Sequence, residues 1–399
     1  MTTSETSAGA ERSRLALRRV ATSSTWRVPL VAWATSRALV LLFAIAGSLV
    51  LGVPARGVDA AVPKPLALLG GWDTTWYLML ARHGYEHDHG QVGHIFTNLA
   101  FFPLLSWIMA VGDAVGLNPF AFALVVSNLT FLVALLAFHR LTTGRLGSAL
   151  ADRATWVLAF APPSVAASQA YTEGVTLALA ICVALAAYRR KYALAGAAAG
   201  VAALARPTGV LVAVLVALLA WRDSRPGRAR RLALALGPAA FAIAGLLLWM
   251  QLARGSWSLP FEAQLAWKRG ALVTGLATHG PQEVGDGWHD LIHWQVSPAW
   301  SSTARDLAFS VLYAWLLVRL WRSEGGLRSP WVGYSVLALA LPLSSGSIVS
   351  MARFGLIAFP LAWPLAEWLG RDTSRSRRAL GGAIVVMALL VMQLAIRSP

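Results

Sequence analysis

The sequence has few charged residues and almost no cysteine. Of its 399 residues, 13% are charged and 57% are hydrophobic, whereas soluble domains carry about 25% charged residues. A soluble globular chain is therefore excluded. The single cysteine, Cys182, lies inside an apolar run, which excludes internal disulfides and thiolate metal centres.

Long apolar runs are present instead, and each is close to the length of about 20 residues that crosses a bilayer as a helix. Clear examples are residues 30–52, 119–138, 232–252 and 379–396. The runs are continuous rather than alternating, which excludes a transmembrane β-barrel. The sequence thus predicts an all-α polytopic membrane protein.

The net charge of +16 comes from basic clusters that lie between the apolar runs. In a soluble chain such a charge would suggest nucleic acid as a partner. Here the positive-inside rule explains it, because basic loops stay in the cytoplasm, so no nucleic-acid partner is expected. The clusters span residues 12–27, 139–153, 189–191, 222–231, 319–328 and 371–378.

These clusters fix the predicted orientation. Residues 1–27 are expected to form a disordered, basic cytoplasmic tail, and residues 28–396 a single transmembrane domain of about eleven crossings. The long loops 53–97 and 255–303 then lie outside, together with short interfacial or re-entrant helices such as 101–116. Because the exterior loops are long, aromatic and acidic, function is expected on that side.

Ionisable residues stand at several of the predicted exterior turns. Asp73 opens a short amphipathic segment, "WDTTWYLMLARHGY", and Glu173, Arg206 and Arg353 each occupy another turn. Several such residues on one side of a membrane suggest a site. Each also has a structural alternative: Asp73 and Glu173 could cap helices, and Arg206 could extend its side chain to the membrane surface.

An ordered set of short motifs resembles the PIG-V-type mannosyltransferases, which are GT-C glycosyltransferases. The motifs are "WDTTWYLMLARHGY", "FFPLLSW", "APPSVAASQAYTEGVTLALA", "LARPTG" and "ARFGLIAFPL". The resemblance covers roughly residues 30–370. It implies a GT-C-type helical bundle and the transfer of mannose from a polyprenyl-phosphate donor to an acceptor hydroxyl of a glycolipid, glycan or protein, with inversion.

The resemblance also suggests roles for particular residues. An inverting transfer needs one base to take the acceptor's proton, and Asp73 fits that role. Arginine can hold the departing phosphate through bidentate contacts; Arg206 is favoured for this, with Arg353 as the second candidate. Glu173 could bind sugar hydroxyls or orient an arginine. Three further residues are ambiguous: Trp72 and Tyr85 between sugar stacking and an aromatic membrane belt, and Arg37 between donor contact and helix pairing.

The segment "RHGYEHDHGQVGH" contains further potential metal ligands. His83, His87 and His89, with the neighbouring acidic side chains, could bind Zn²⁺ or Mn²⁺. A lipid phosphate carries a charge that arginines can meet, so the proposed chemistry requires no metal and no cofactor is expected.

Two other classes of function stay open. A transporter or lipid flippase would show related halves and charges near the bilayer midplane, and neither is evident. A non-catalytic membrane subunit of a glycan-assembly complex would keep the helices but tolerate the loss of Asp73. Lysine is rare, at Lys64, Lys191 and Lys268 only, which suggests a high-GC bacterial coding sequence and a plasma-membrane location.

The predicted orientation can be tested by cysteine labelling. Cysteines placed at Ser224 and Ser374 lie in basic clusters and should resist an impermeant thiol reagent in intact cells, whereas one at Ser297 should react. Labelling at position 224 in sealed cells would show that the predicted orientation is the wrong way round.

Overall fold

The computed structural model describes residues 3–52, 62–87, 90–267, 269, 289, 298–345 and 347–396. Within these ranges the protein is helical, with no strand longer than an isolated bridge. This confirms the predicted all-α class. Several positions named from the sequence lie outside the described residues: His89, Ser297, and parts of the loops 53–97 and 255–303.

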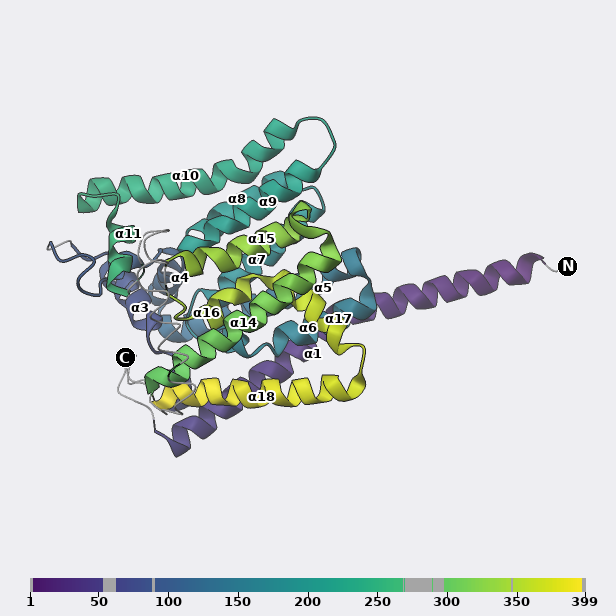
Figure 1. Ribbon diagram of the computed structural model, residues 1–399, viewed down its shortest axis with the longest axis horizontal. Helices are drawn as coiled ribbons and strands as arrows, with labels where there is room; N and C mark the ends of the chain where they lie inside the picture. Colours follow the sequence, from purple (N-terminus) through teal and green to yellow (C-terminus); the bar gives the residue numbers. More distant parts are fainter. Residues whose placement is uncertain are drawn as a thin grey trace.

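The helices form one bundle whose axes run in broadly the same direction (Figure 1). They are α1 (Thr3–Val50), α2 (Lys64–Ala67), α3 (Asp73–His83), α4 (Leu104–Ala114), α5 (Pro119–Leu146), α6 (Ser148–Ala159), α7 (Glu173–Tyr188), α8 (Tyr192–Ala203), α9 (Val210–Arg222), α10 (Arg228–Arg254), α11 (Leu259–Glu262), α14 (Pro298–Glu324), α15 (Pro330–Ser344), α16 (Met351–Phe354), α17 (Ala362–Leu369) and α18 (Thr373–Ile396). Short 3₁₀ segments connect them: η1 (Asn98–Ala100), η2 (Pro162–Ser168), η3 (Pro207–Gly209), η4 (Ala263–Trp267), η5 (Gly326–Arg328), η6 (Gly355–Ile357) and η7 (Phe359–Leu361).

Four of the described helices are long and apolar enough to cross a membrane, namely Thr25–Val50 of α1, α5, α10 and most of α18. A fifth crossing results if η2 and α7, which meet at 105°, form one broken span. The predicted count of about eleven crossings is not reached by this measure. One reason is that α6, α8, α9 and α15 are short, and another is that the predicted crossing 355–370 is divided into η6, η7 and α17.

Close packing of the helices depends on small residues. A Cβ at Gly196 of α8 would lie 1.7 Å from the carbonyl oxygen of Leu234 in α10, and one at Gly174 of α7 would lie 2.7 Å from that of Ser127 in α5. Glycine therefore lets the backbones of these pairs approach each other, as is common where membrane helices pack.

The start of the chain differs from the expectation of a disordered tail. Helix α1 begins at Thr3; its first part extends beyond the bundle, and its later part lies within the bundle (Figure 1). Eleven of residues 3–27 are alanine, arginine or leucine, which have high helix propensity, so the helix extends into the polar segment.

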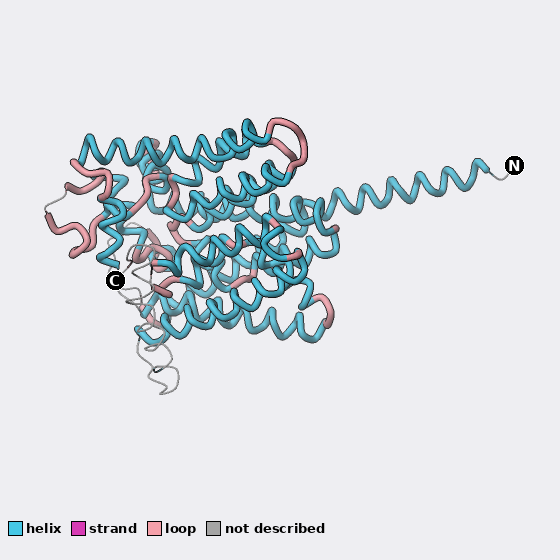
Figure 2. Tube along the Cα trace, turned by 45° about the horizontal axis from the view of Figure 1, so that its top comes forward, coloured by secondary structure: helices cyan, strands magenta, loops and turns pink. Residues whose placement is uncertain are grey.

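The two ends of the bundle differ. The α9–α10 and α17–α18 connections lie at the end from which α1 projects (Figure 1), and they carry the basic clusters 222–231 and 371–378. Longer loops gather at the opposite end (Figure 2). Helices α3, α4, α11 and α16 lie at that loop-rich end (Figure 1).

Candidate functional site

Four of the ionisable residues singled out from the sequence meet at the loop-rich end. Arg353 Nη1 donates a hydrogen bond to Asp73 Oδ2 and lies 3.5 Å from Glu173 Oε1. Arg206 Nη1 donates to the same Glu173 oxygen at 3.1 Å. Two carboxylates and two guanidiniums from four separate segments thus form one chain of ion pairs, which we call the charge cluster.

Asp73 is positioned by a strained turn. The residue before it, Trp72, has a φ of 56°, in the left-handed region that side chains other than glycine rarely adopt. Helix α3 starts at Asp73 and ends at Gly84, whose N–H donates to the carbonyl of Leu80. The helix-cap interpretation of Asp73 is wrong: Trp72 occupies the cap position, and the Asp73 carboxylate turns to Arg353.

Glu173 is the most deeply buried member of the charge cluster, with 3% of its side chain exposed. It is the first residue of α7 and follows the sharp bend after η2. The interpretation of Glu173 as a helix cap is also wrong. Its Oε1 accepts a hydrogen bond from Arg206 and lies within ion-pair distance of Arg353. The second oxygen, Oε2, has no hydrogen-bond partner among the described residues.

Both arginines lie against aromatic rings. Arg206 lies in the break between α8 and η3, with its guanidinium 4.5 Å from the centroid of Phe354. Its side chain is 12% exposed and faces Glu173, so it does not extend to the membrane surface. Arg353 lies 5.0 Å from the rings of both Tyr171 and Phe354. Burial lowers the pKa of Arg353, but the Asp73 and Glu173 carboxylates outweigh this and raise it above its ordinary value.

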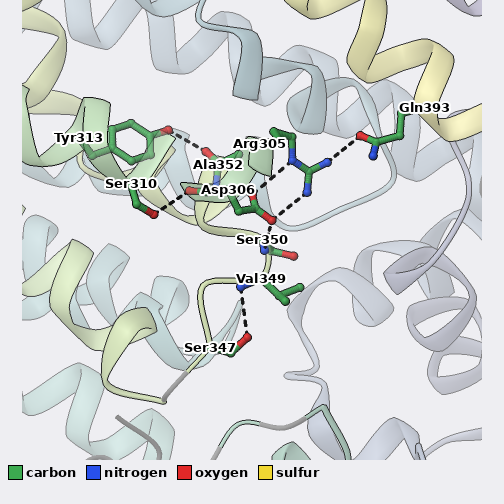
Figure 3. Close-up of polar contacts among 9 residues, drawn as sticks. All are labelled: Arg305, Asp306, Ser310, Tyr313, Ser347, Val349, Ser350, Ala352 and Gln393. Atoms are coloured by element: carbon green, nitrogen blue, oxygen red, sulfur yellow. Dashed lines mark hydrogen bonds and ion pairs between the residues drawn. The ribbon is translucent and has the colours of Figure 1, made fainter. Parts of the chain in front are cut away.

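A buried aspartate that the sequence-based reasoning missed anchors the segment that carries Arg353. Asp306 of α14 is fully buried and accepts hydrogen bonds from the backbone N–H groups of Ser350 and Ala352, at 2.8 and 3.0 Å (Figure 3). Arg305 donates to the same carboxylate at 2.9 Å and to Gln393 of α18, also at 2.9 Å. The signal was available, since an acidic residue inside an apolar run is a known pointer to a functional site.

A cavity of about 150 Å³ adjoins the charge cluster. Its walls come from the start of α3, η2 and the turn after it, α14, α16 and α18. Polar and aromatic side chains on its lining include Trp72, Asp73, Gln169, Arg305, Arg353 and Gln393. Arg206 and Glu173 are not among the lining residues, so they lie behind Arg353 rather than on the wall.

Strained backbone surrounds this cavity. Besides glycine, three described residues have positive φ, and two of them, Trp72 and Ser350, line the cavity. Such conformations cost of order 1–3 kcal/mol each and gather at functional sites. The strain at Ser350 is held by its hydrogen bond to Asp306.

Two of the residues suggested for donor binding lie elsewhere. Arg37 of α1 donates to the carbonyl of Ser164 at 2.7 Å and to the hydroxyls of Ser164 and Ser168. Its guanidinium also lies 4.5 Å from the ring of Phe131. Of the two possibilities for Arg37, these contacts match helix pairing, because they attach η2 to α1.

Tyr85 does not face the charge cluster either. Its hydroxyl donates to the carbonyl of Phe101 at 2.7 Å, and its ring packs against Trp249 of α10. It lines a separate, mainly apolar cavity of about 540 Å³ between α3, α4 and α10. Tyr85, which could have stacked on a sugar or belonged to an aromatic belt, is thus buried in the fold and does not line the cavity beside Asp73.

The described histidines do not assemble a metal centre. No group of three or more His, Cys, Asp or Glu with metal-binding geometry occurs in the ranges that the structure covers. His83 and His87 belong to these ranges, whereas His89 does not.

No protein-family model and no curated protein matches the chain in sequence. Two solved structures are similar to it in shape. One is the Archaeoglobus fulgidus oligosaccharyltransferase in complex with zinc and sulfate, with a TM-score of 0.43 and 14% identity, covering 90% of this chain and 53% of that one. The other is the archaeal oligosaccharyltransferase AglB from the same organism, in complex with an inhibitory peptide and a dolichol-phosphate; its TM-score is 0.39, with 14% identity and coverage of 90% and 54%. The chain spans about half the length of each.

The anchoring role of Asp306 predicts a loss of stability in Asp306→Asn. An amide cannot accept from both backbone N–H groups and from Arg305, so buried donors lose their partner, at a cost of about 1–3 kcal/mol. Thermal unfolding of the purified protein should show a lower midpoint.

Asp372→Asn is the matched control. Asp372 accepts from the N–H groups of Ser374 and Arg375 at the start of α18, and asparagine caps helices about as well as aspartate. An equal drop in the midpoint of thermal unfolding in both variants would show that Asp306 has no special anchoring role.

Proposed function

We propose that the chain is an integral-membrane glycosyltransferase. In this proposal it transfers a sugar, mannose by the family resemblance, from a polyprenyl-phosphate carrier to an acceptor hydroxyl with inversion. The observation that carries the proposal is the Asp73 carboxylate on the wall of a cavity, hydrogen-bonded to an arginine that lines the same cavity.

The chemistry requires one base and one anion-binding group. The acceptor oxygen forms a bond to the anomeric carbon while the bond from that carbon to the phosphate oxygen breaks. Asp73 takes the acceptor's proton, and the polyprenyl phosphate departs with the electron pair. Arg353 holds Oδ2, so Oδ1 is the candidate proton acceptor. A positioned base of this kind contributes about 10²–10⁴ in rate.

Phosphate departs as an anion and needs no general acid, but its charge must be held. Arg353 is the better candidate for this role, since it lines the cavity beside Asp73 and Arg206 does not. Arg206, favoured on sequence grounds, would then act through Glu173, whose carboxylate lies between the two arginines. An arginine can meet the charge of such a phosphate through bidentate hydrogen bonds, so this chemistry requires no metal.

The orientation follows from charge. The basic connections α9–α10 and α17–α18 lie at the end opposite the loop-rich one (Figure 1), and basic loops remain cytoplasmic. The active site would then face the exterior of the plasma membrane, where a lipid-linked donor meets a glycolipid, glycan or protein acceptor.

The alternatives fit the site less well. Transporters bind their substrates near the bilayer midplane, whereas Asp73 lies at the start of α3, in the loop-rich end of the bundle. A non-catalytic subunit would not need a strained turn beside a carboxylate that lines a cavity.

Asp73→Asn tests the catalytic role. Asparagine keeps the size of the side chain, its carbonyl oxygen can still accept from Arg353, and Arg353 keeps its second partner, Glu173, so the variant should still fold. Removal of the basic oxygen should lower sugar transfer by about 10²–10⁴. Transfer from labelled polyprenyl-phosphate mannose in membranes measures the effect.

Asp113→Asn in α4 is the control, because this exposed aspartate belongs to neither the charge cluster nor the cavity. It should transfer at the wild-type rate. A well-expressed Asp73→Asn protein that is equally active would rule out Asp73 as the base.

A further inference from the structure

Gln169 has an unusual environment for an amide side chain. It follows η2, is 5% exposed and lines the cavity beside Asp73. Its Nε2 has no hydrogen-bond partner among the described residues. Buried polar groups almost always have a partner, because leaving one unpaired is unfavourable. An unpaired donor on the wall of a cavity therefore points to a ligand that accepts a hydrogen bond.

Two guanidiniums share that wall with Gln169. Arg353 contributes one, and Arg305 of α14 contributes the other. Arg305 has five N–H donors; it donates two hydrogen bonds to Asp306 and one to Gln393. Its orientation is thus fixed by neighbours on α14 and α18 while donor capacity is left for a ligand.

The chemistry of this wall selects the ligand class. One amide donor and two guanidiniums favour an acceptor-rich anion, and planar guanidiniums match phosphate oxygens in particular. Asp73 adjoins the same space, which would repel a carboxylate or phosphate from its own side and favour a position nearer Gln169 and Arg305.

We propose that Gln169, Arg305 and Arg353 form the subsite for the phosphodiester of the lipid carrier, with Gln169 Nε2 donating a hydrogen bond to a phosphate oxygen. This inference rests on the proposed function. It adds two residues to the site and places the phosphate on the η2 and α14 side of Asp73.

Binding of farnesyl phosphate to the purified full-length chain tests the subsite without any need for turnover. Gln169→Leu removes the donor and replaces a buried, unpaired amide by an apolar side chain. We expect the thermal midpoint to stay equal or rise, and the dissociation constant for farnesyl phosphate to increase by about 10-fold to 100-fold, the worth of a hydrogen bond to a charged group. Gln169→Glu should bind even more weakly, because its charge repels the phosphate.

Three controls make the readout specific. Gln251→Leu, on the exposed end of α10, should bind farnesyl phosphate as the wild type does. Farnesol, which lacks the phosphate, should bind equally to all variants. Gln169→Met, with a flexible side chain that adapts to irregular spaces, gives the same comparison if the leucine variant fails to fold.

The possible failures are distinguishable. Wild-type affinity in a folded Gln169→Leu protein, or in the methionine variant, would overturn the subsite and leave the proposed function standing. A folded wild-type protein that does not bind farnesyl phosphate would contradict the proposed donor itself. Inorganic phosphate that binds as tightly as farnesyl phosphate would assign the subsite to a free ion and overturn the lipid assignment.

Discussion

The arrangement of this end of the protein depends on a buried carboxylate that must be paired. Glu173 has almost no contact with solvent, and its Oε1 lies within ion-pair distance of two arginines. Removing one partner from such a buried pair typically costs 3–5 kcal/mol. The break between α8 and η3, the turn at α16 and the start of α7 are therefore held together by charge, and the start of α3 joins them through Arg353 and Asp73.

A second constraint holds the same region from the other side. Asp306 accepts from two backbone N–H groups next to Arg353, and Arg305 joins that carboxylate to α18 through Gln393. The unfavourable backbone conformation at Ser350 is held by its hydrogen bond to Asp306. The one at Trp72 adjoins Asp73, which pairs with Arg353. The residues of the proposed site are thus held in place by contacts within the protein, as the proposed catalysis by positioned charges requires.

The sequence predicted the charge cluster better than it predicted the surroundings. Asp73, Glu173, Arg206 and Arg353 stood out because an ionisable residue at the turn of an apolar chain has few structural reasons to be there. Arg37 and Tyr85 were ambiguous, because the direction of a side chain depends on packing between distant segments. Gln169 was missed for the same reason: an unpaired amide is recognised only when its neighbours are known. The predicted all-α class is confirmed. The first 27 residues were expected to be disordered because they are polar, but helix α1 begins at Thr3, as helix propensity allows.

The proposed function is the transfer of a sugar from a polyprenyl phosphate. The most direct measurement supplies membranes that contain the protein with a panel of labelled polyprenyl-phosphate sugars and follows both products. We expect label from one donor, mannose first, to pass into a lipid or protein fraction with inverted anomeric configuration, while an equal amount of polyprenyl phosphate appears. If membranes with the folded protein consume no more of any donor in the panel than membranes that lack it, the proposed function is wrong.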